Sequence, residues 1–542
     1  MWKHALVASA LCLAASACAA GDEPGGDPDD VLVDDLSFFS NVAREFTVTG
    51  ESSVEVESSY DGRTPAIRRA RAMELVKLKN MQIAWFLGAL LVEKDKTDKN
   101  NKYGGYGGLV GFGSEPEADV REEGGRRWRF KYRVTVAGIK ELISKLPGEN
   151  AGEGSKTFRL AMGRLSNEEM AKIQFGDEWY EQAPWKAFDP SKVPADRLEY
   201  IDLRIAPAPR SEDAYLAHDR LFEDGVLTVA VHFGYDYYTR FDTTGSRQLY
   251  NILTKDRGFT SPAAQYKEYL RSSGPLTKTI TSNGHPIQVR LWIYHPGNAP
   301  QDIPGPDPNT DDGGKQLEAD MRASLREKEV VIFSGHSGPT YAFALANWKK
   351  TAEGDLDDTE IPGLTLPSTY QIVMADGCDT YALGAAFWQN PAKADRKNLN
   401  VITTTSFSNA GYVDSTLRMV DAVTNVTGGK FVAQTLSQLT RGFDRDQGED
   451  FKTMYGVHGV DANPKYDPLA KRSSLCKPCR ANDECGGDGN RCTRLSSRQA
   501  ACTYGCAADS GCPDGYACTP IGSVSAQTVK TRQCVPISKR CE

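Results

Sequence analysis

The chain has 542 residues, with 64 Lys or Arg against 72 Asp or Glu and a formal net charge of −8 at pH 7. This length exceeds what one hydrophobic core normally holds, so it predicts two to four domains. The charge excess is mild, and no basic block or stripe interrupts it, which argues against a nucleic-acid partner.

The first residues are predicted to direct export. Met1–Ala20 combines a basic residue, the apolar run Ala5–Ala15 and small residues, as a signal peptide does. Two processing routes are open: cleavage at an Ala-x-Ala-like site, or lipidation of Cys18, because Ala15–Cys18 is similar to a bacterial lipobox. We favour lipidation, since the Gly/Asp/Pro-rich stretch Gly21–Asp30 suits a flexible tether. No later run reaches the ~18 apolar residues of a membrane span.

Residues 31–210 are predicted to form an α+β region. Alternating apolar and polar residues indicate strands at Phe46–Thr49, Ser53–Val56 and Arg129–Val134. Spaced apolar residues indicate a long helix over Arg69–Glu93. The basic face of the third strand is typical of a solvated sheet surface; a binding face is the alternative. No catalytic motif is present in this region.

From about residue 211 to 470, strand-like and helix-like segments alternate. This alternation predicts an α/β domain, a mostly parallel sheet covered by helices on both faces. Besides the two central strands described next, we expect strands at Val226–Phe233, Thr277–Ile280, Ile287–Tyr294 and Asn400–Thr405, the second and third being joined as a hairpin through Asn283-Gly284. We expect helices at Ser246–Leu253, Pro262–Leu270, Lys315–Lys328, Tyr341–Trp348, Tyr381–Trp388, Ser415–Val423 and Phe431–Phe443.

Two apolar runs organise this domain: Val330–Gly338 and Tyr370–Cys378. Each is short, β-branched or aromatic and nearly continuous, as a strand buried on both faces would be. The helical-looking stretch Tyr341–Trp348 separates them, which predicts parallel neighbours with a right-handed crossover. His336 and Cys378 then lie at the carboxyl ends of adjacent strands, where open α/β sheets bind their ligands. A thiolate beside an imidazole is a competent acyl-transfer nucleophile.

A strand ending in histidine, followed by a strand ending in a small residue and cysteine, resembles the motifs of clan CD cysteine peptidases: caspases, legumains, clostripain, gingipains and the separase protease domain. The resemblance covers roughly Leu221 to Leu469. It implies a caspase-like fold, with Cys378 as nucleophile and His336 as base and as proton donor to the leaving amine. The oxyanion would be held by the N–H of Cys378 and by that of Ser337 or Gly338. Ser337 stands where the family has glycine.

Other interpretations of these residues remain open. A lone cysteine such as Cys378 is ordinarily a buried core residue. His232, and after it His458, are the alternative bases, although we expect structural roles for both. Asp376 and Asp379 flank the nucleophile and indicate either surface acidity or a substrate pocket for basic residues.

No metal or cofactor is expected at the candidate site. The acidic loop Asp355–Glu360 could bind calcium. Its spacing does not match an EF-hand, so a solvated loop is the simpler interpretation.

The C-terminal region is rich in cysteine and repeats itself. Ten cysteines in an exported tail predict about five disulfides and an oxidising compartment, while zinc bound through the Cys476/Cys479 pair is the rival interpretation. The two related halves are Cys479, Cys485, Cys492 and Cys502, then Cys506, Cys512, Cys518 and Cys534, with Cys476 and Cys541 outside them.

Together these patterns predict an exported cysteine endopeptidase acting on proteins or peptides, placed in the cell envelope as an outer-membrane lipoprotein or secreted. The lipid on Cys18 would be its only membrane contact. The alternatives are an inactive relative that binds partners through the Cys-rich tail, and a transpeptidase. The expected domains are a signal peptide (1–18), a linker (19–30), an α+β domain (31–210), a caspase-like domain (211–470) and a disulfide module (471–542).

Overall fold

A computed structural model gives the fold. It describes residues 38–96, 109–114, 119–140, 142–152, 154–175, 188–282, 285–297, 305–337, 342–405, 408, 413–427, 430–446, 455–465, 467–469, 475–485, 489–506, 508–513, 515–522 and 530–541. The predicted signal peptide, Cys18, the predicted Asn283-Gly284 turn and Gly338 lie outside these residues. Within them we find no helix with the length and apolar character needed to cross a bilayer.

The N-terminal region forms a seven-stranded antiparallel sheet in the order β3-β5-β2-β8-β7-β6, with β4 also paired to β5. Its central pair is β2 and β5, and the two short strands predicted at Phe46–Thr49 and Ser53–Val56 are parts of the single strand β2. The elements are β2 (Ala43–Glu55), α1 (Pro65–Lys96), β3 (Leu109–Ser114), β4 (Arg121–Gly124), β5 (Arg127–Ile139), α2 (Leu142–Lys145), β6 (Glu149–Asn150), β7 (Lys156–Gly163), α3 (Asn167–Phe175) and β8 (Leu198–Pro207).

The exposed face of β5 carries the basic residues noted in the sequence. Trp128, Phe130 and Tyr132 point into the core, and the residues between them are exposed. Arg129 pairs with Glu51 and Glu123 on neighbouring strands. The basic face is therefore paired with acidic neighbours, as a solvated sheet surface usually is.

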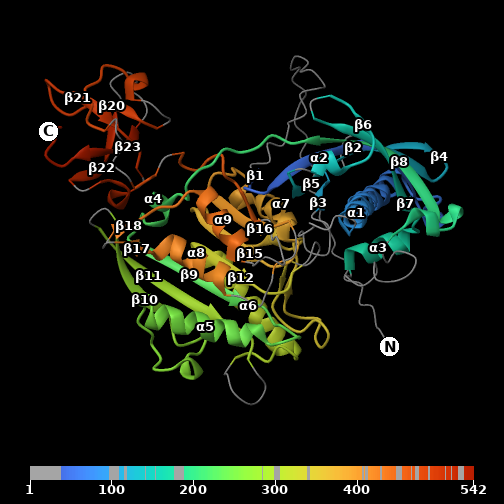
Figure 1. The fold of residues 1–542 in the computed structure, drawn as a ribbon, viewed down its shortest axis with the longest axis horizontal. Coiled ribbons are helices and arrows are strands. Elements are labelled where there is room, and N and C mark those ends of the chain that lie inside the picture. Colours follow the sequence, from blue (N-terminus) through green and yellow to red (C-terminus); the bar gives the residue numbers. More distant parts are fainter. Residues whose placement is uncertain are drawn as a thin grey trace. The chain divides into compact units, whose positions relative to one another are not determined.

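The central region is an α/β domain built on a mixed eight-stranded sheet in the order β1-β19-β16-β15-β12-β9-β11-β10 (Figure 1). The strands from β11 to β16 in this order are parallel, and β10, β19 and β1 are antiparallel to their neighbours. The strands are β1 (Phe38–Phe39), β9 (Val226–Phe233), β10 (Leu276–Ser282), β11 (His285–Tyr294), β12 (Val330–Ser334), β15 (Gln371–Asp376), β16 (Leu399–Thr404) and β19 (Tyr455–His458).

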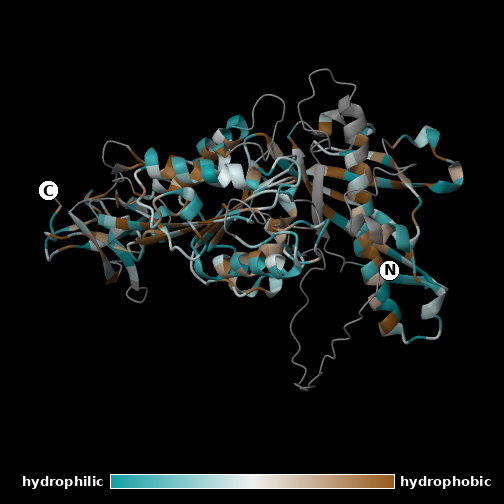
Figure 2. Ribbon diagram, turned by 90° about the horizontal axis from the view of Figure 1, so that it is seen from below, coloured by the Kyte–Doolittle hydropathy of each residue, from teal (hydrophilic) through white to brown (hydrophobic). Residues whose placement is uncertain are grey.

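Helices cover both faces of this sheet. Apolar residues of α5, α8 and α9 share one core cluster with alternate strand residues such as Val229 and Val330. His232, which points to the other face, contacts Ser324 of α6. Figure 2 shows hydrophobic residues along the strands of this sheet and a mixture of hydrophilic and hydrophobic residues on the helices. The helices are α4 (His218–Leu221), α5 (Phe241–Lys255), α6 (Asp311–Glu327), α7 (Leu383–Trp388), α8 (Asp414–Thr424) and α9 (Leu436–Asp446).

Two predicted helices of this domain are wrong. Tyr341–Trp348 instead contains β13 (Phe343–Ala344), which pairs with β14 (Asp355–Leu356). The N–H groups of Ala344 and Leu345 bond to His336 and Gly354 rather than along a helix, so tertiary pairing overrides the local helix propensity. Within Pro262–Leu270 only a single 3₁₀ turn, Tyr266–Glu268, forms. The remaining short pair is β17 (Val426–Thr427) with β18 (Lys430–Phe431).

The C-terminal region is a cluster of five disulfides, as predicted from the cysteine count. Two hairpins, β20 (Arg491–Arg494) with β21 (Ala500–Thr503) and β22 (Tyr516–Gly522) with β23 (Lys530–Pro536), correspond to the two halves. In each half the first cysteine pairs with the third and the second with the fourth. The bonds are Cys479–Cys492, Cys485–Cys502, Cys506–Cys518 and Cys512–Cys534, and Cys476–Cys541 joins the ends.

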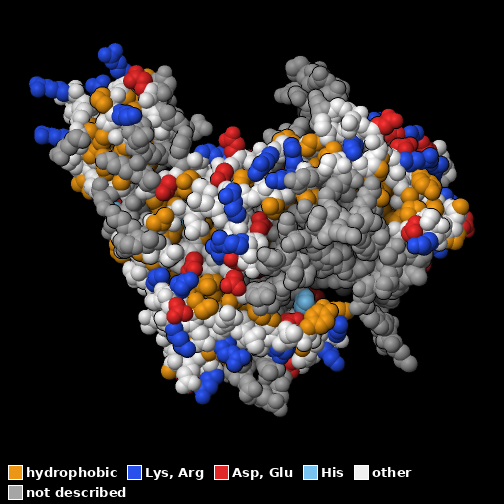
Figure 3. Space-filling view, in the orientation of Figure 1, with side chains coloured by type: hydrophobic (Ala, Val, Ile, Leu, Met, Phe, Trp, Pro, Cys, Tyr) orange, Lys and Arg blue, Asp and Glu red, His pale blue; other side chains and the backbone are white. Residues whose placement is uncertain are grey.

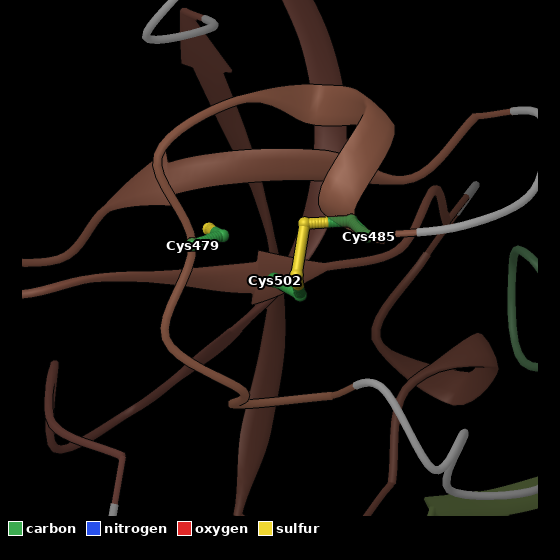
Figure 4. Close-up of side chains that lie close together, drawn as sticks. All are labelled: Cys479, Cys485 and Cys502. Atoms are coloured by element: carbon green, nitrogen blue, oxygen red, sulfur yellow. A yellow bond between two sulfur atoms is a disulfide. The ribbon is translucent and has the colours of Figure 1, made fainter.

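The sulfur atoms of this module are consumed by disulfides. Those of Cys479, Cys485 and Cys502 lie within 4.8 Å of one another, and Figure 4 shows the bond between the last two. Since zinc is bound by thiolates, disulfide sulfur atoms cannot serve as its ligands. This cluster indicates an exported protein, because disulfides of this kind persist in oxidising compartments.

Candidate functional site

The two predicted catalytic residues follow adjacent parallel strands, each at the same distance in sequence from the last paired residues of those strands. The register of β12 and β15 pairs Ser334 with Asp376. The pairing continues one residue further, since the Gly335 N–H donates to the Asp376 carbonyl at 3.1 Å. His336 and Cys378 are each two residues beyond the Ser334–Asp376 pair. Because neighbouring strands lie about 4.8 Å apart, both residues occupy one end of the sheet.

Glycines let these strand ends approach each other closely. A Cβ on Gly377 would lie 2.5 Å from the Cβ of Ser337 and 2.9 Å from the Gly335 carbonyl oxygen. A Cβ on Gly335 would lie 2.9 Å from the Cα of Gly234, which follows β9. The ends of β9, β12 and β15 are therefore packed backbone against backbone, an arrangement that side chains would prevent.

Cys378 retains its thiol and is partly exposed. Its Sγ donates to the carbonyl of Ser408, with an S–O distance of 3.7 Å. Ser408 comes after β16, the next strand in the sheet, and its hydroxyl donates to Asp376. Cys378 thus lies at the surface of the sheet end and is not a buried core cysteine.

His336 is held by a carboxylate that the sequence analysis did not identify. Its Nε2 lies 3.2 Å from Oδ1 of Asp236, in the loop that follows β9. The same carboxylate accepts hydrogen bonds from the N–H groups of Tyr238, Thr239 and Phe241 and from the Thr239 hydroxyl. With this many donors, Asp236 is fixed in place before any substrate binds.

The charge of Asp236 determines which nitrogen of His336 carries a proton. Burial tends to raise the pKa of Asp236, but the donors from Phe241 and Thr239 outweigh it and hold the pKa well below its usual range. An ionised carboxylate accepts a hydrogen bond from Nε2–H, so in the neutral ring Nε2 carries the proton and Nδ1 does not. Within the described part of the chain, the hydrogen bond of the His336 ring is the one from Nε2.

Ser337 can supply an oxyanion donor despite replacing glycine. Outside glycine, positive φ angles occur at six described residues, and Ser337 is not one of them. Its backbone therefore needs no conformation reserved for glycine. The Ser337 side chain is buried and donates to the carbonyl of Ala342. The oxyanion role of Ser337 and Cys378 stays a prediction, and that of Gly338 lies outside the described residues.

The two aspartates beside the nucleophile differ. Asp376 is 4% exposed, and its carboxylate accepts hydrogen bonds from Ser408, Ser415 and Tyr455. Burial raises its pKa against the effect of these hydroxyls. It anchors the strand end and presents no exposed charge to a substrate. Asp379 is partly exposed with φ of 52°, and its proposed place in a substrate pocket stays a prediction.

The alternative histidines are internal. His232 contacts the Ser324 hydroxyl at 2.9 Å and stacks on Tyr294, and His458 contacts the Thr403 hydroxyl at 2.9 Å. Both side chains are buried, and burial lowers the pKa of each to about 3. An imidazole this hard to protonate is a poor proton donor near neutral pH, so both have the structural roles expected for them.

The acidic loop predicted at Asp355–Glu360 begins at β14. Burial, followed by the charges of Asp357 and Glu318, raises the pKa of Asp355 to about 7. Glu318 and Glu360 both pair with Arg322, so arginine already neutralises part of the charge. Calcium binding here stays untested.

Two residues of the site escaped the sequence analysis. Asp236 and Ser408 come from loops that follow β9 and β16, the strands on either side of the β12–β15 pair. The rule that located His336 and Cys378 could have located them, had the strand order been known. No protein-family model matches the sequence, and no curated protein matches it.

Proposed function

We propose that this protein is an exported cysteine endopeptidase of the caspase-like type, with Cys378 as nucleophile and His336 as base. The observation that carries the proposal is the common level of these residues at adjacent strand ends, with Asp236 fixing the imidazole. A mostly parallel sheet with helices on both faces is also the architecture that the resemblance implies.

We propose the following reaction, which the shared strand-end position of Cys378 and His336 supports. The thiol proton moves from Sγ of Cys378 to Nδ1 of His336, and Sγ bonds to the carbonyl carbon of the scissile peptide. The oxyanion accepts hydrogen bonds from the N–H groups of Cys378 and Ser337. The C–N bond then breaks, and Nδ1–H gives its proton to the leaving nitrogen. Water then loses a proton to Nδ1 and its oxygen bonds to the thioester carbon. The C–S bond breaks, the carboxylic acid product leaves, and Nδ1–H returns its proton to Sγ.

Asp236 contributes by positioning the base. Its carboxylate keeps the ring oriented and stabilises the imidazolium that forms when the thiol proton is transferred. It touches no reacting atom, so it is a positioning residue.

A digest of a peptide library tests the proposal. The wild type is expected to release new N-termini that the Cys378→Ala and His336→Ala variants do not. An iodoacetamide probe should label Cys378 rapidly, and more slowly in His336→Ala, because the group that stabilises the thiolate is gone. Slow labelling unaffected by His336→Ala, together with no cleavage, would favour an inactive binding protein. Products heavier than the substrates would instead indicate transpeptidation.

We further propose that the mature protein is anchored by a lipid on Cys18. The lipobox-like sequence and the tether-like stretch that follows support this. In cell fractionation, Cys18→Ala should move the protein from the membrane to the soluble fraction. Unchanged membrane association of the variant, or a mature N-terminus other than Cys18, would exclude the anchor.

A further inference from the structure

An aromatic group surrounds the imidazole of His336. The ring of Tyr237 stacks on it, with centroids 4.5 Å apart and planes inclined by 17°. Tyr238 meets the imidazole edge-on at 5.9 Å. Trp348 meets Tyr237 edge-on at 6.2 Å, and Lys349 places Nζ 4.6 Å from the Tyr237 centroid. We call Tyr237, Tyr238 and Trp348 the aromatic wall.

Of the three rings in the aromatic wall, only that of Tyr237 is explained by a role in orienting His336. Tyr237 covers a face of the imidazole and suffices to orient it. Tyr238 is 75% exposed and Trp348 is 44% exposed. Most of the Tyr238 side chain and much of the Trp348 side chain therefore face solvent. On the face drawn in Figure 3, hydrophobic side chains gather beside a histidine at a hollow in the surface. Exposed aromatic surface next to a reactive group is typical of a binding subsite.

The backbone on both sides of the wall is held in place. The N–H of Tyr238 donates to Asp236, the same carboxylate that fixes His336. On the other side, the N–H of Asn347 donates to the Pro308 carbonyl at 2.9 Å and its side-chain amide donates to Asn309 at 2.8 Å. Preorganised aromatic rings bind apolar groups at a lower entropy cost than mobile ones.

The position of the wall relative to the reaction identifies what it would contact. In the proposed function, on which this inference rests, the imidazole gives its proton to the leaving amine. The first residue after the scissile bond carries that amine, so it lies beside His336, whereas the residues before the bond stay attached to Cys378. A side chain of this first residue would reach Tyr238 and Trp348.

We propose that the aromatic wall is a subsite for a large apolar or aromatic side chain directly after the scissile bond. Lys349 at its rim would favour an acidic residue further along the leaving segment, because its ammonium is not neutralised by the rings it covers. Apolar pockets of this kind commonly discriminate by about 10- to 200-fold.

A library digest read by mass spectrometry tests this without knowledge of the other subsites. The first residue of each new N-terminus should be enriched about tenfold or more in Phe, Tyr, Trp and Leu over Gly and Ser. Trp348→Ala and Tyr238→Ala should remove most of this enrichment and leave the residue before the bond unchanged. Tyr200→Ala, which removes an exposed aromatic ring of the N-terminal sheet, should retain it.

Two results would overturn the subsite. One is a wild-type digest without enrichment; the other is an equal loss of all cleavages in Trp348→Ala and Tyr238→Ala, which would mean that the wall only supports His336. If the wild type cleaves nothing, the proposed function fails, and capture of the same library by the Cys378→Ala protein decides the subsite. Peptides rich in aromatic residues, captured less well by Trp348→Ala, support it, and capture without preference excludes it.

Discussion

At the scale of single residues, the hydrogen bond between Asp236 and His336 determines which ring nitrogen carries the proton in the neutral imidazole. A Cys–His pair reacts only if the imidazole presents its unprotonated nitrogen to the thiol. Asp236 favours this arrangement by accepting a hydrogen bond from Nε2–H, and four hydrogen bonds from nearby residues hold its carboxylate in place. The thiol of Cys378 donates to the carbonyl of Ser408 in the structure, so the proposed reaction requires this weak bond to be exchanged for one to Nδ1.

Asp236→Asn should therefore slow the site without unfolding it. An amide can offer the ring the wrong partner and no longer stabilises the imidazolium. We expect the rate of Cys378 alkylation, and any peptide turnover, to fall by about 10- to 100-fold, as for other groups that orient a functional histidine. Kinetics of iodoacetamide labelling measure this.

The exposed Asp312→Asn, in the first turn of α6, is a matched control and should label at the wild-type rate. A wild-type labelling rate in Asp236→Asn at unchanged melting temperature would contradict the positioning role. Because the pKa of Asp236 is far below its usual range, the deficit should persist from pH 5 to 8.

At the scale of residues, the sequence predicted that His336 and Cys378 lie at adjacent strand ends, but it did not indicate the residues that contact them. His336 and Cys378 end apolar runs, which is visible in one dimension. Asp236 lies in a polar loop with no such mark, and its role arises because β9 pairs with β12, a contact between segments about 100 residues apart. Ser408 was missed for the same reason.

At the scale of elements, the close approach of the strand ends depends on glycine. Gly377→Ala would force a methyl group to within 2.5 Å of the Ser337 Cβ, so the β12 and β15 ends must separate. Overpacking of this kind typically costs about 1–3 kcal/mol. We expect a lower melting temperature and slower labelling of Cys378, since its alignment with His336 is disturbed.

Gly363→Ala provides the comparison, because a Cβ there would meet nothing within 4 Å. It should melt and label like the wild type. If Gly377→Ala behaved in the same way, the packing of the strand ends would not control the site.

The start of β12 carries a pH-sensitive contact. Glu329 accepts hydrogen bonds from the N–H and hydroxyl of Thr228 on β9. Burial, followed by the charge of Asp224, raises its pKa to about 7 against the Thr228 donors. In the unfolded chain the pKa of a glutamate is about 4.3. Between about pH 4.3 and pH 7 the folded protein therefore binds a proton at Glu329 that the unfolded chain has lost. Stability is therefore lost as pH rises from about 4.3 to 7 and stays low above it.

Glu329→Gln should remove this loss, because the amide oxygen still accepts from Thr228 and carries no charge to bury. Urea unfolding at pH 5 and pH 8 measures it. We expect the fall in unfolding free energy between these pH values to shrink by about 1–3 kcal/mol in the variant. An unchanged difference would mean that Glu329 is not protonated in the folded protein.

Sequence patterns predicted a strand or helix correctly where the local conformational preference of the residues agrees with their packing in the fold. The strands β9 and β12 begin and end where their apolar runs do, because such residues can only be buried between two helical layers. Tyr341–Trp348 failed because Ala and Leu favour a helix locally, whereas its backbone pairs with Gly354 and with the loop after β9 through Leu345. Gly354 lies just beyond this stretch and Tyr235 lies far before it in sequence, so the composition of Tyr341–Trp348 alone does not show these partners.

At the scale of the whole molecule, cysteine is used in two separate ways. Ten cysteines are oxidised in the C-terminal module, and Cys378 in the sheet domain retains a thiol. An oxidising compartment supports both only if no second thiol lies close to Cys378. The sequence predicted the number of disulfides from an even count. It could not predict their pairing, because eight cysteines in two halves allow many connectivities.

The pairing within each half is the last prediction. The repeated first-to-third and second-to-fourth pattern places one disulfide, Cys492–Cys479 or Cys518–Cys506, on the first strand of each hairpin and the other on its second strand. Without these bonds, hairpins of this size are barely stable in water. Cys485→Ala with Cys502→Ala should therefore lower the module's unfolding free energy by about 2–5 kcal/mol.

Labelling of Cys378 should be unaffected by that double substitution, because the sheet domain has its own hydrophobic core. Peptide mapping under non-reducing conditions should recover the five pairs of the structure, and thiol counting in denaturant should find Cys378 as the reactive cysteine of residues 19–542. Additional thiols in the tail, or zinc at stoichiometric levels, would contradict the disulfide assignment. Loss of Cys378 labelling in the double variant would show instead that the module is needed to keep the sheet domain folded.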